Sequence, residues 1–222
     1  MTAFPGRPRY GARRLRGDHF PAERPDVWAG VEPLMITSYL WLKNGYEPRV
    51  EVRLGTTPDS LYVSFRVEER RVRASFTRFQ DPVYKDSCVE FFVDPCPEKS
   101  GGYLNFEANA LGTMLIAIGR DRHDRRPLTV AEVAGLEIRP SLVEPVDGDI
   151  GAQGWALDYR IPAGIFENLC GARLGPGSRA AANFYKCGDE TEFPHYGAWS
   201  PVQTPEPDFH RPEFFGTLEF LA

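Results

Sequence analysis

The stretch RVEVRLGTTPDSLYVSFRV, residues 49–67, carries the clearest structural pattern in the chain. Apolar side chains occupy every second position on both sides of the turn at residues 57–60: Val50, Val52, Leu54, Leu61, Val63, Phe65 and Val67. Side chains that alternate in this way point to one face of a β-strand. The stretch therefore predicts a β-hairpin with one buried face.

Short segments of the same kind recur along the chain and are separated by turn residues. They cover residues 36–42, 87–94, 103–110, 114–118, 136–142, 155–161, 179–187 and 217–221. One short helix is predicted at residues 162–169, where Pro162 stands at the first turn and Gly171 ends the pattern. Many strands with almost no helix predict an all-β protein, a β-sandwich or jelly roll.

The chain reads as one sandwich domain preceded by an arm. Residues 1–34 are rich in Arg, Pro and Gly and are predicted to pack as an arm on the domain formed by residues 35–222. The formal net charge of -5 argues against nonspecific nucleic-acid binding, which needs a basic surface. No stretch approaches the roughly 20 apolar residues that span a bilayer, so no membrane partner is expected.

No export signal is visible in the sequence, which favours a cytoplasmic protein, or a secreted one if a signal was removed. We expect a monomer. The cysteines, Cys88, Cys96, Cys170 and Cys187, are too few and too scattered for a disulfide framework, and no CxxC pair suggests zinc. Free thiols fit a reducing cytoplasm.

The segment NFYKCGDETEFPHYGAWSPVQTPEPDFHRPEFFGTLEF, residues 183–220, gathers aromatic rings, charges and prolines without helical or strand periodicity for most of its length. It contains His195, Tyr196, Trp199 and His210. A loop this long in a compact domain is usually functional or disordered, and its aromatic residues argue against disorder. We therefore expect it to contribute to a functional site.

A polar ladder in the middle of the chain supplies a second set of candidates. Glu90 projects from an otherwise apolar strand face, and the next strand places Asn105, Glu107 and Asn109 on one face with Tyr103. Two carboxylates such as Glu90 and Glu107 could act as acid and base on a glycosidic bond. They could equally accept hydrogen bonds from a ligand, and we favour this second interpretation.

Two other chemistries have candidate residues but no supporting spacing. Metal ligands could come from Cys187, Asp189, Glu190, Glu192 and His195, and loop oxygens could bind calcium, although no twelve-residue calcium loop is present. Haem could take axial ligands from Met35 or Met114 with His195, His210 or Lys186. A Met on an alternating strand is ordinarily part of the core.

Sugar binding accounts for more of these residues together. A pyranose ring presents apolar C–H faces and a rim of hydroxyl groups, so its site needs flat aromatic walls and polar side chains around them. Candidate walls are Tyr84, Tyr103, Tyr196 and Trp199. Candidate polar groups are Glu90, Asn105, Glu107, Asn109, Asn183 and Lys186.

Several motifs resemble the family 9 carbohydrate-binding modules, which accompany xylanases, and their free-standing relatives. They are DSCVEFFVDP at residues 86–95, YLNFEANALGT at 103–113, ANFYKCGDET at 182–191, GAWSP at 197–201 and DFHRPEFFGTLEF at 208–220. They occur in the family's order and extend from about the first hairpin to the end of the chain. The resemblance implies a β-sandwich of two antiparallel sheets without catalytic activity, and a structural calcium ion.

The resemblance also implies a way of binding. In the family, two aromatic rings sandwich a terminal sugar, often at the reducing end of xylan or cellulose; the matching positions are Tyr84 and Trp199. The family's acceptor glutamate falls on Glu90. Two departures stand out: one wall is Tyr instead of Trp, and Glu107 occupies a position where the family can place an arginine.

Together these observations predict a noncatalytic protein that binds an oligo- or polysaccharide and requires no cofactor, with a structural calcium ion as an option. The predicted ligand-binding residues are Tyr84, Glu90, Glu107, Asn109, Lys186, His195 and Trp199. The alternatives are a glycan-active hydrolase that uses Glu90 and Glu107, or a haem-binding relative of the same architecture.

Overall fold

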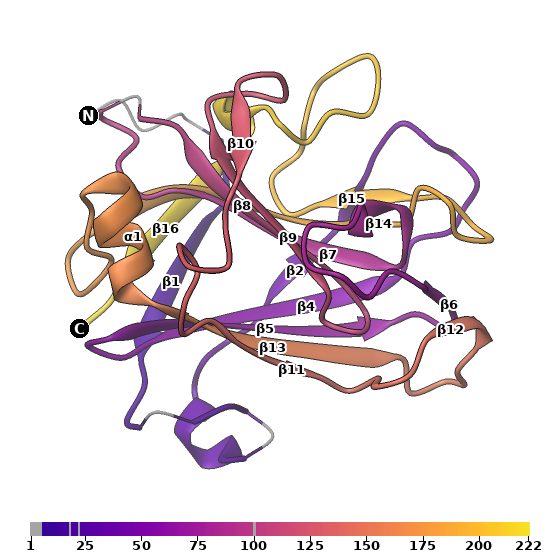
Figure 1. Ribbon diagram of the computed structural model, residues 1–222, viewed down its shortest axis with the longest axis horizontal. Helices are drawn as coiled ribbons and strands as arrows, with labels where there is room; N and C mark the ends of the chain where they lie inside the picture. Colours follow the sequence, from indigo (N-terminus) through magenta and orange to yellow (C-terminus); the bar gives the residue numbers. More distant parts are fainter. Residues whose placement is uncertain (1–5, 18, 22, 100) are drawn as a thin grey trace.

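Two β-sheets pack face to face in the structure, a computed structural model that describes residues 6–17, 19–21, 23–99 and 101–222. Figure 1 shows sheet A above and sheet B below, with one short helix at the left. The predicted β-sandwich is confirmed. All strand pairings in the two sheets are antiparallel except those of β1 (Arg9–Arg14), which runs parallel to both of its partners.

Sheet A has the order β10-β9-β8-β7-β14-β16-β1, with β15 added beside β14 and β3 beside β15. Its strands are β3 (Ser38–Tyr39), β7 (Cys88–Asp94), β8 (Tyr103–Asn109), β9 (Met114–Gly119), β10 (Arg125–Pro127), β14 (Arg179–Cys187), β15 (Tyr196–Ala198) and β16 (Gly216–Phe220). Sheet B has the order β1-β4-β5-β13-β11, with β2 beside β4. Its strands are β2 (Leu34–Ile36), β4 (Arg49–Thr56), β5 (Ser60–Glu68), β11 (Glu137–Pro140) and β13 (Trp155–Pro162).

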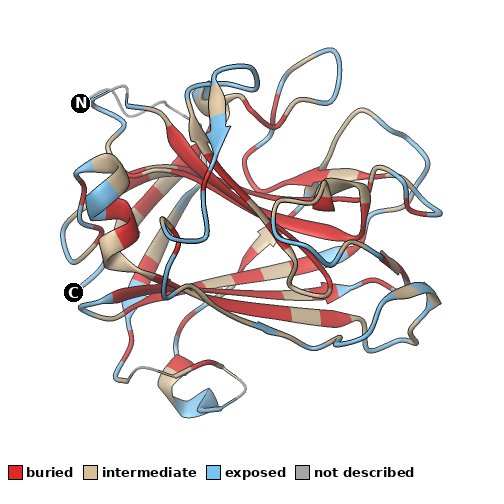
Figure 2. Cartoon of the chain, viewed as in Figure 1, coloured by how far each residue is buried: buried red, intermediate tan, exposed pale blue. Residues whose placement is uncertain are grey.

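The core lies between the sheets, where the alternating apolar side chains of both inner faces meet. Figure 2 shows buried residues along the strands of both sheets. Phe91 on β7 and Phe184 on β14 stack with their ring centroids 4.9 Å apart, and Phe65 from sheet B meets Phe184 edge-on at 6.3 Å. Burial of each such side chain contributes about 1.5–3 kcal/mol. This shared apolar layer holds the two sheets together.

The hairpin predicted at residues 49–67 forms as β4 and β5. It differs from the prediction in one respect, because β5 is buried on both faces. On its outer side, Tyr62 packs edge-on against Phe20 at 5.5 Å and against Trp28 at 6.4 Å. The segment before β2 therefore covers part of the outer face of sheet B. The alternating pattern of the hairpin does not predict this cover.

The arm predicted at residues 1–34 contains strand β1, so it is not free of regular structure. Residues 9–12 of β1 pair with β16 of sheet A, and residues 13 and 14 pair with β4 of sheet B. Ala12 is fully buried in the core, whereas most of the neighbouring side chains are arginines directed outward. A strand with only one small buried residue has no alternating apolar pattern, so β1 could not be predicted from the sequence.

The predicted helix is α1 (Ala163–Cys170), with Pro162 at its N-cap. Gly171 ends it in the left-handed conformation, with φ 61°, and its amide donates to the carbonyl of Glu167. Three short 3-10 turns complete the helical content: η1 (Pro25–Trp28), η2 (Val83–Lys85) and η3 (Pro212–Phe214). No helix in the described part of the chain has the length and apolar character needed to cross a membrane.

Some short strands were not predicted. β6 (Arg71–Ala74) pairs with β12 (Val146–Asp149) in a separate two-stranded sheet, and the predicted strand at residues 36–42 is divided between β2 and β3. β15 interrupts the tail that seemed to lack strand periodicity, and β10 lies in the charged segment at residues 120–127. These strands are too short or too charged to show alternation, and their pairing partners are distant in sequence.

Replacing Ala12 with glutamate tests whether β1 is an integral part of the sandwich. Because Ala12 is fully buried, the new carboxylate would lack a partner, and we expect the free energy of unfolding to fall by several kcal/mol, on the order of 3. Arg13→Glu, at the next and exposed position, should change it by less than about 0.5 kcal/mol. Urea unfolding measures both, and equal effects would show that β1 is dispensable.

Candidate functional site

The outer face of sheet A, directed away from sheet B, carries most of the polar residues predicted from the sequence. Because side chains alternate along a strand, Phe91 enters the core while Glu90 and Phe92 point to the outer face. The outer-face residues of β7, β8 and β14 include Cys88, Glu90, Phe92, Tyr103, Asn105, Glu107, Asn109, Asn183, Tyr185 and Cys187. Each of these is at most 3% exposed, so this face is covered rather than open to water.

Loops from distant parts of the sequence cover this face. Figure 1 shows the β9–β10 hairpin and the loop after β15 above it, with the segment before β4 at one side. Their apolar side chains form a second core with Phe92, Tyr103 and Tyr185. The residues contributed by the loops include Val202, Phe209 and Phe215, and the partly buried Leu40, Trp41, Phe76 and Tyr84.

Three polar side chains, Glu90, Asn105 and Glu107, form what we call the polar floor. Glu90 and Glu107 are direct partners across β7 and β8. Glu107 Oε1 accepts hydrogen bonds from Asn105 Nδ2 at 2.9 Å and from the Arg125 guanidinium at 3.2 Å. Glu90 Oε1 accepts from the Cys187 thiol at 3.1 Å. The two carboxylates predicted from the sequence therefore do lie side by side.

Burial and mutual repulsion favour the uncharged forms of these carboxyl groups. Burial raises the pKa of Glu90 well above its usual value, and the neighbouring Glu107 raises it further. Burial also raises the pKa of Glu107, to about 7, against the opposing effect of Arg125. In this environment a carboxyl group can both donate and accept hydrogen bonds near neutral pH.

Two acceptor atoms of the polar floor have no hydrogen-bond partner among the residues that the structure describes. They are Glu90 Oε2 and Asn105 Oδ1, both buried. A buried acceptor without a donor destabilises the folded state by about 1–3 kcal/mol. Such groups persist where function requires them, and hydroxyl donors of a ligand would satisfy them.

Aromatic residues that are only partly buried border this covered face. Trp41 lies edge-on to Tyr196, with ring centroids 5.9 Å apart, and its Nε1 donates to the Thr204 carbonyl at 2.7 Å. Its φ of 66° is unusual for a bulky residue and marks a strained position in the backbone. Tyr84 lies on η2, and its carbonyl accepts from the Asp189 amide at 3.1 Å.

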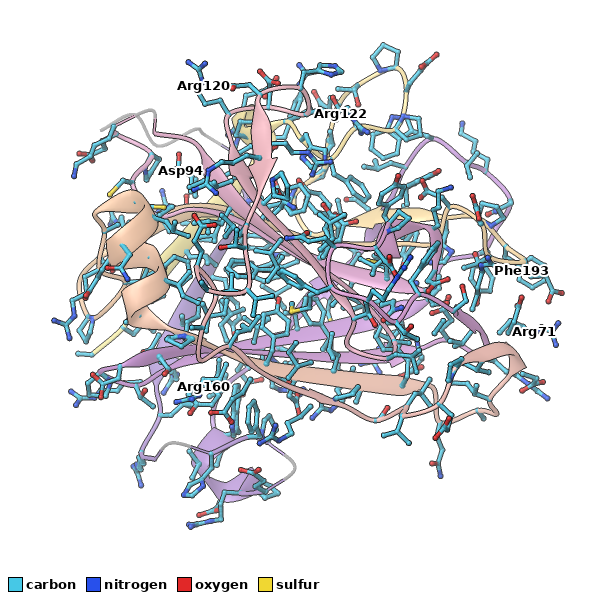
Figure 3. All side chains as sticks on the ribbon, viewed as in Figure 1. Arg71, Asp94, Arg120, Arg122, Arg160 and Phe193 are labelled. Atoms are coloured by element: carbon cyan, nitrogen blue, oxygen red, sulfur yellow. The ribbon has the colours of Figure 1, made fainter. Side chains whose placement is uncertain are left out.

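Two arginines of the β9–β10 segment extend towards the same region. Arg125 on β10 is partly exposed and forms the ion pair with Glu107. Arg122, labelled near the top of Figure 3, pairs with Asp208 at 3.0 Å and donates to the Pro207 carbonyl at 3.3 Å. These contacts tie the β9–β10 hairpin to the loop before β16.

Trp199 does not join this arrangement. It is 8% exposed and belongs to the core between the sheets, where it lies edge-on to Phe184 at 5.8 Å. Atoms of its ring would lie 2.6 Å from a Cβ at Gly216, so Gly216 leaves space for it. Tyr84 instead packs against the outer cluster, so the two residues do not face each other as walls of one cleft.

Lys186 and His195 form part of a buried network instead of a polar rim. The Lys186 ammonium lies 3.2 Å from Glu69 and donates to His195 Nε2 at 2.7 Å. Trp155 Nε1 donates at 2.9 Å to Glu69 Oε2, the same oxygen that lies 3.2 Å from the Lys186 ammonium. The other ring nitrogen of His195, Nδ1, donates to the Phe193 carbonyl. Both side chains were misplaced by the sequence prediction, because Lys186 shares the inner face of β14 with Phe184.

Asn109 lies on the outer face but is fully used by the protein. Its Nδ2 donates to Asp86 at 3.0 Å and to the Phe76 carbonyl, and its Oδ1 accepts from the amides of Leu111 and Thr113. These bonds shape the turn between β8 and β9. Asn109 therefore has a structural role that its side-chain type alone did not indicate.

Comparison with known families supports the resemblance seen in the motifs. A model described as carbohydrate-binding family 9 matches residues 28–220. The chain belongs to carbohydrate-binding family 9. The match begins after β1, so the strand that joins the two sheets lies outside it.

Solved structures show the same fold. The chain is similar to a proposed carbohydrate-binding protein from Bacteroides uniformis, with 31% identity and a TM-score of 0.87 over 97% of this chain and 100% of that one. A family 9 module from Caldicellulosiruptor kristjanssonii in complex with cellotriose gives 13% identity and a TM-score of 0.65 over 97% and 94%. The glucose complex from the same organism gives 12% and 0.61 over 96% and 95%. No match was found among curated proteins.

Family 9 modules are noncatalytic, which decides against the hydrolase alternative for Glu90 and Glu107.

The haem alternative also finds little support in the geometry. Both ring nitrogens of His195 are engaged, Nδ1 of His210 is bonded to the Tyr103 hydroxyl at 2.8 Å, and Met114 is buried in the core.

Two of the carboxylates considered as metal ligands form ion pairs in the structure. Glu190 pairs with Lys85 at 2.8 Å, and Glu192 pairs with Arg71. Among the described residues, the grouped side chains able to hold an ion are Cys88, Glu90 and Cys187. Calcium binds six to eight oxygen atoms, and two sulfur atoms do not supply them.

Replacing Trp199 with alanine separates its role in folding from a role in binding. Because Trp199 is buried against Phe184, we expect the variant to lose about 3–5 kcal/mol of stability in urea unfolding. Trp41→Ala, at a partly exposed ring, should lose less. A Trp199→Ala protein as stable as the parent would contradict this assignment to the core.

The buried histidines predict how stability depends on pH. Burial and the adjacent Lys186 lower the pKa of His195 to about 2, and burial lowers that of His210 to about 2. Below about pH 6.5 the unfolded chain therefore binds protons that the folded chain excludes, and stability falls by up to about 1.4 kcal/mol per pH unit for each histidine. The groups facing His195 are Lys186, Glu69 and the ring of Tyr46.

Urea unfolding between pH 7 and pH 5 measures this effect. The His195→Gln variant should lose less stability between pH 7 and pH 5 than the parent protein does. This expectation does not depend on how stable the variant is at pH 7. The raised pKa values of Glu107 and Asp189 oppose the trend equally in both proteins, so the difference between them reports on the histidine. Identical pH slopes would show that His195 is not held neutral.

Proposed function

We propose that this family 9 protein binds the terminal sugar of a glucose-based oligosaccharide above the polar floor. The observation that carries the proposal is the pair of buried acceptors without partners, Glu90 Oε2 and Asn105 Oδ1. Sugar hydroxyls donate hydrogen bonds, and two acceptors on neighbouring strands suit adjacent hydroxyls. The related modules from Caldicellulosiruptor kristjanssonii carry cellotriose and glucose, which supports a glucan end as the first ligand to test.

The aromatic surface for such a ligand comes from Tyr84 and Trp41 in this proposal. Both rings are partly exposed and pack on the outer cluster, whereas Trp199 is committed to the core. Stacking of an aromatic ring on the apolar face of a sugar would orient it over the polar floor. Trp41 thus takes the part that the sequence assigned to Trp199, although it comes from the segment before β4.

The exchange of an arginine for Glu107 is offset by Arg125. The guanidinium of Arg125 reaches Glu107 from β10, which lies two strands away from β8, so a positive group is present although its strand of origin differs. Its remaining N–H groups can donate to sugar oxygens, while the ion pair fixes its orientation. The charge inversion noted in the sequence is therefore local, and the site keeps both donors and acceptors.

Calorimetric titration with cellotriose, glucose and xylotriose tests the proposal. Tyr84→Ala and Trp41→Ala should each weaken binding of the preferred sugar about tenfold or more, since one aromatic contact contributes on the order of 1 kcal/mol beyond buried area. Phe193→Ala removes an exposed ring that stacks on Tyr46, and it should bind like the parent.

The three sugars also decide between polysaccharides. Preference for cellotriose over xylotriose indicates a cellulose-type end, and the reverse order indicates xylan. If Tyr84→Ala and Trp41→Ala both bind as tightly as the parent protein, the ligand does not lie above the polar floor and the proposal fails.

A further inference from the structure

Two cysteines and a glutamate lie together on the outer face of sheet A. Cys88 on β7 is the direct partner of Cys187 on β14, and Glu90 follows Cys88 by two residues on the same strand face. One ligand atom from each of the three lies within 4.8 Å of the others. The alternation of two adjacent strands therefore holds three potential ligands in place without any loop.

All three side chains are buried and only weakly bonded. None is more than 3% exposed. The thiol of Cys187 donates to Glu90 Oε1 at 3.1 Å and approaches the Tyr84 carbonyl at 3.6 Å, and the thiol of Cys88 approaches the Val89 carbonyl at 3.6 Å. Within the described ranges, Glu90 Oε2 has no hydrogen-bond partner. The group thus contains a buried carboxylate oxygen whose polarity no described residue satisfies.

The donor atoms select the kind of ion. Two thiolates and one carboxylate oxygen suit zinc, which binds sulfur at about 2.3 Å and oxygen at about 2.0–2.2 Å in tetrahedral geometry. Ligand atoms of such a centre lie about 3.5–4 Å apart, which the spacing of this group already allows. Magnesium and calcium require oxygen ligands and are disfavoured here.

We infer that Cys88, Cys187 and Glu90 form a binding site for zinc or a similarly thiophilic divalent ion. Three protein ligands leave a fourth position for water or another small donor. The ion would cross-link β7 and β14 where β7 begins and β14 ends. Glu90 is shared with the proposed sugar site, but the two cysteines have no part in sugar binding, so the inference goes beyond that site.

Cobalt substitution provides a direct test. The full-length protein is reduced with a phosphine, freed of metal by a chelator and titrated with Co²⁺. We expect one Co²⁺ per chain, with sulfur-to-cobalt charge-transfer absorption and the strong visible bands of a tetrahedral centre, which Zn²⁺ then abolishes by displacement. Zn²⁺ should also raise the melting temperature, whereas equal concentrations of Mg²⁺ or Ca²⁺ should not.

Variants at the four cysteines supply the controls. Cys88→Ser and Cys187→Ser should lose the charge-transfer band. They should also bind Zn²⁺ more than about 100-fold more weakly, because losing a ligand costs more affinity than losing a hydrogen bond that supports a ligand. Cys96→Ser and Cys170→Ser, at partly exposed positions, should retain both properties. Circular dichroism confirms that each variant is folded.

Several results would overturn the inference. One is a folded, reduced parent protein that shows no charge-transfer band with Co²⁺ and no stabilisation by Zn²⁺, a result that does not depend on any variant. A second is an unchanged band in Cys187→Ser. A third is a Cys88–Cys187 disulfide that persists in the folded protein under reductant, which would show that the pair serves as a cross-link. Loss of sugar binding in Tyr84→Ala would leave all these outcomes unaffected.

Discussion

Alternation along the three central strands of sheet A divides the molecule into two environments. On one face of β7, β8 and β14, Phe91, Phe106 and Phe184 build the core that holds the sheets together. On the other face the same strands present Glu90 and Glu107. A shift of register by one residue would exchange the two sets, so the apolar core and the polar floor depend on the same pairing.

The elements predicted from the sequence were those defined by local patterns. The hairpin around residues 57–60, the strands carrying Glu90 and Glu107, and the helix after Pro162 all follow from alternation or capping within a few residues. The same rule places Lys186 on the inner face with Phe184, so its burial could have been found by applying alternation through the end of β14. Lys186 was predicted to bind ligand because of its charged side chain, without regard to its position along the strand.

Other parts of the candidate site depend on contacts between distant segments. Arg125 meets Glu107 because β10 returns along β9, and the register of that hairpin is not apparent in a charged, turn-rich segment. Trp41 reaches the outer cluster through Tyr196 and Phe209, which are more than a hundred residues away in sequence. Burial of Trp199 likewise depends on the space left by Gly216. Tertiary packing, rather than local propensity, decides these positions.

Strand β1 imposes an order on events during synthesis. Its residues precede those of the other described strands, yet Tyr10 pairs with Leu218 on β16, which follows them all. Closing a loop of this length is entropically unfavourable and must await the last strand. Until then residues 9–12 of β1 lack their partner on β16, and exposed strand edges promote association between chains. Emergence of β16, rather than of the middle hairpins, is therefore the step at which this sandwich can close.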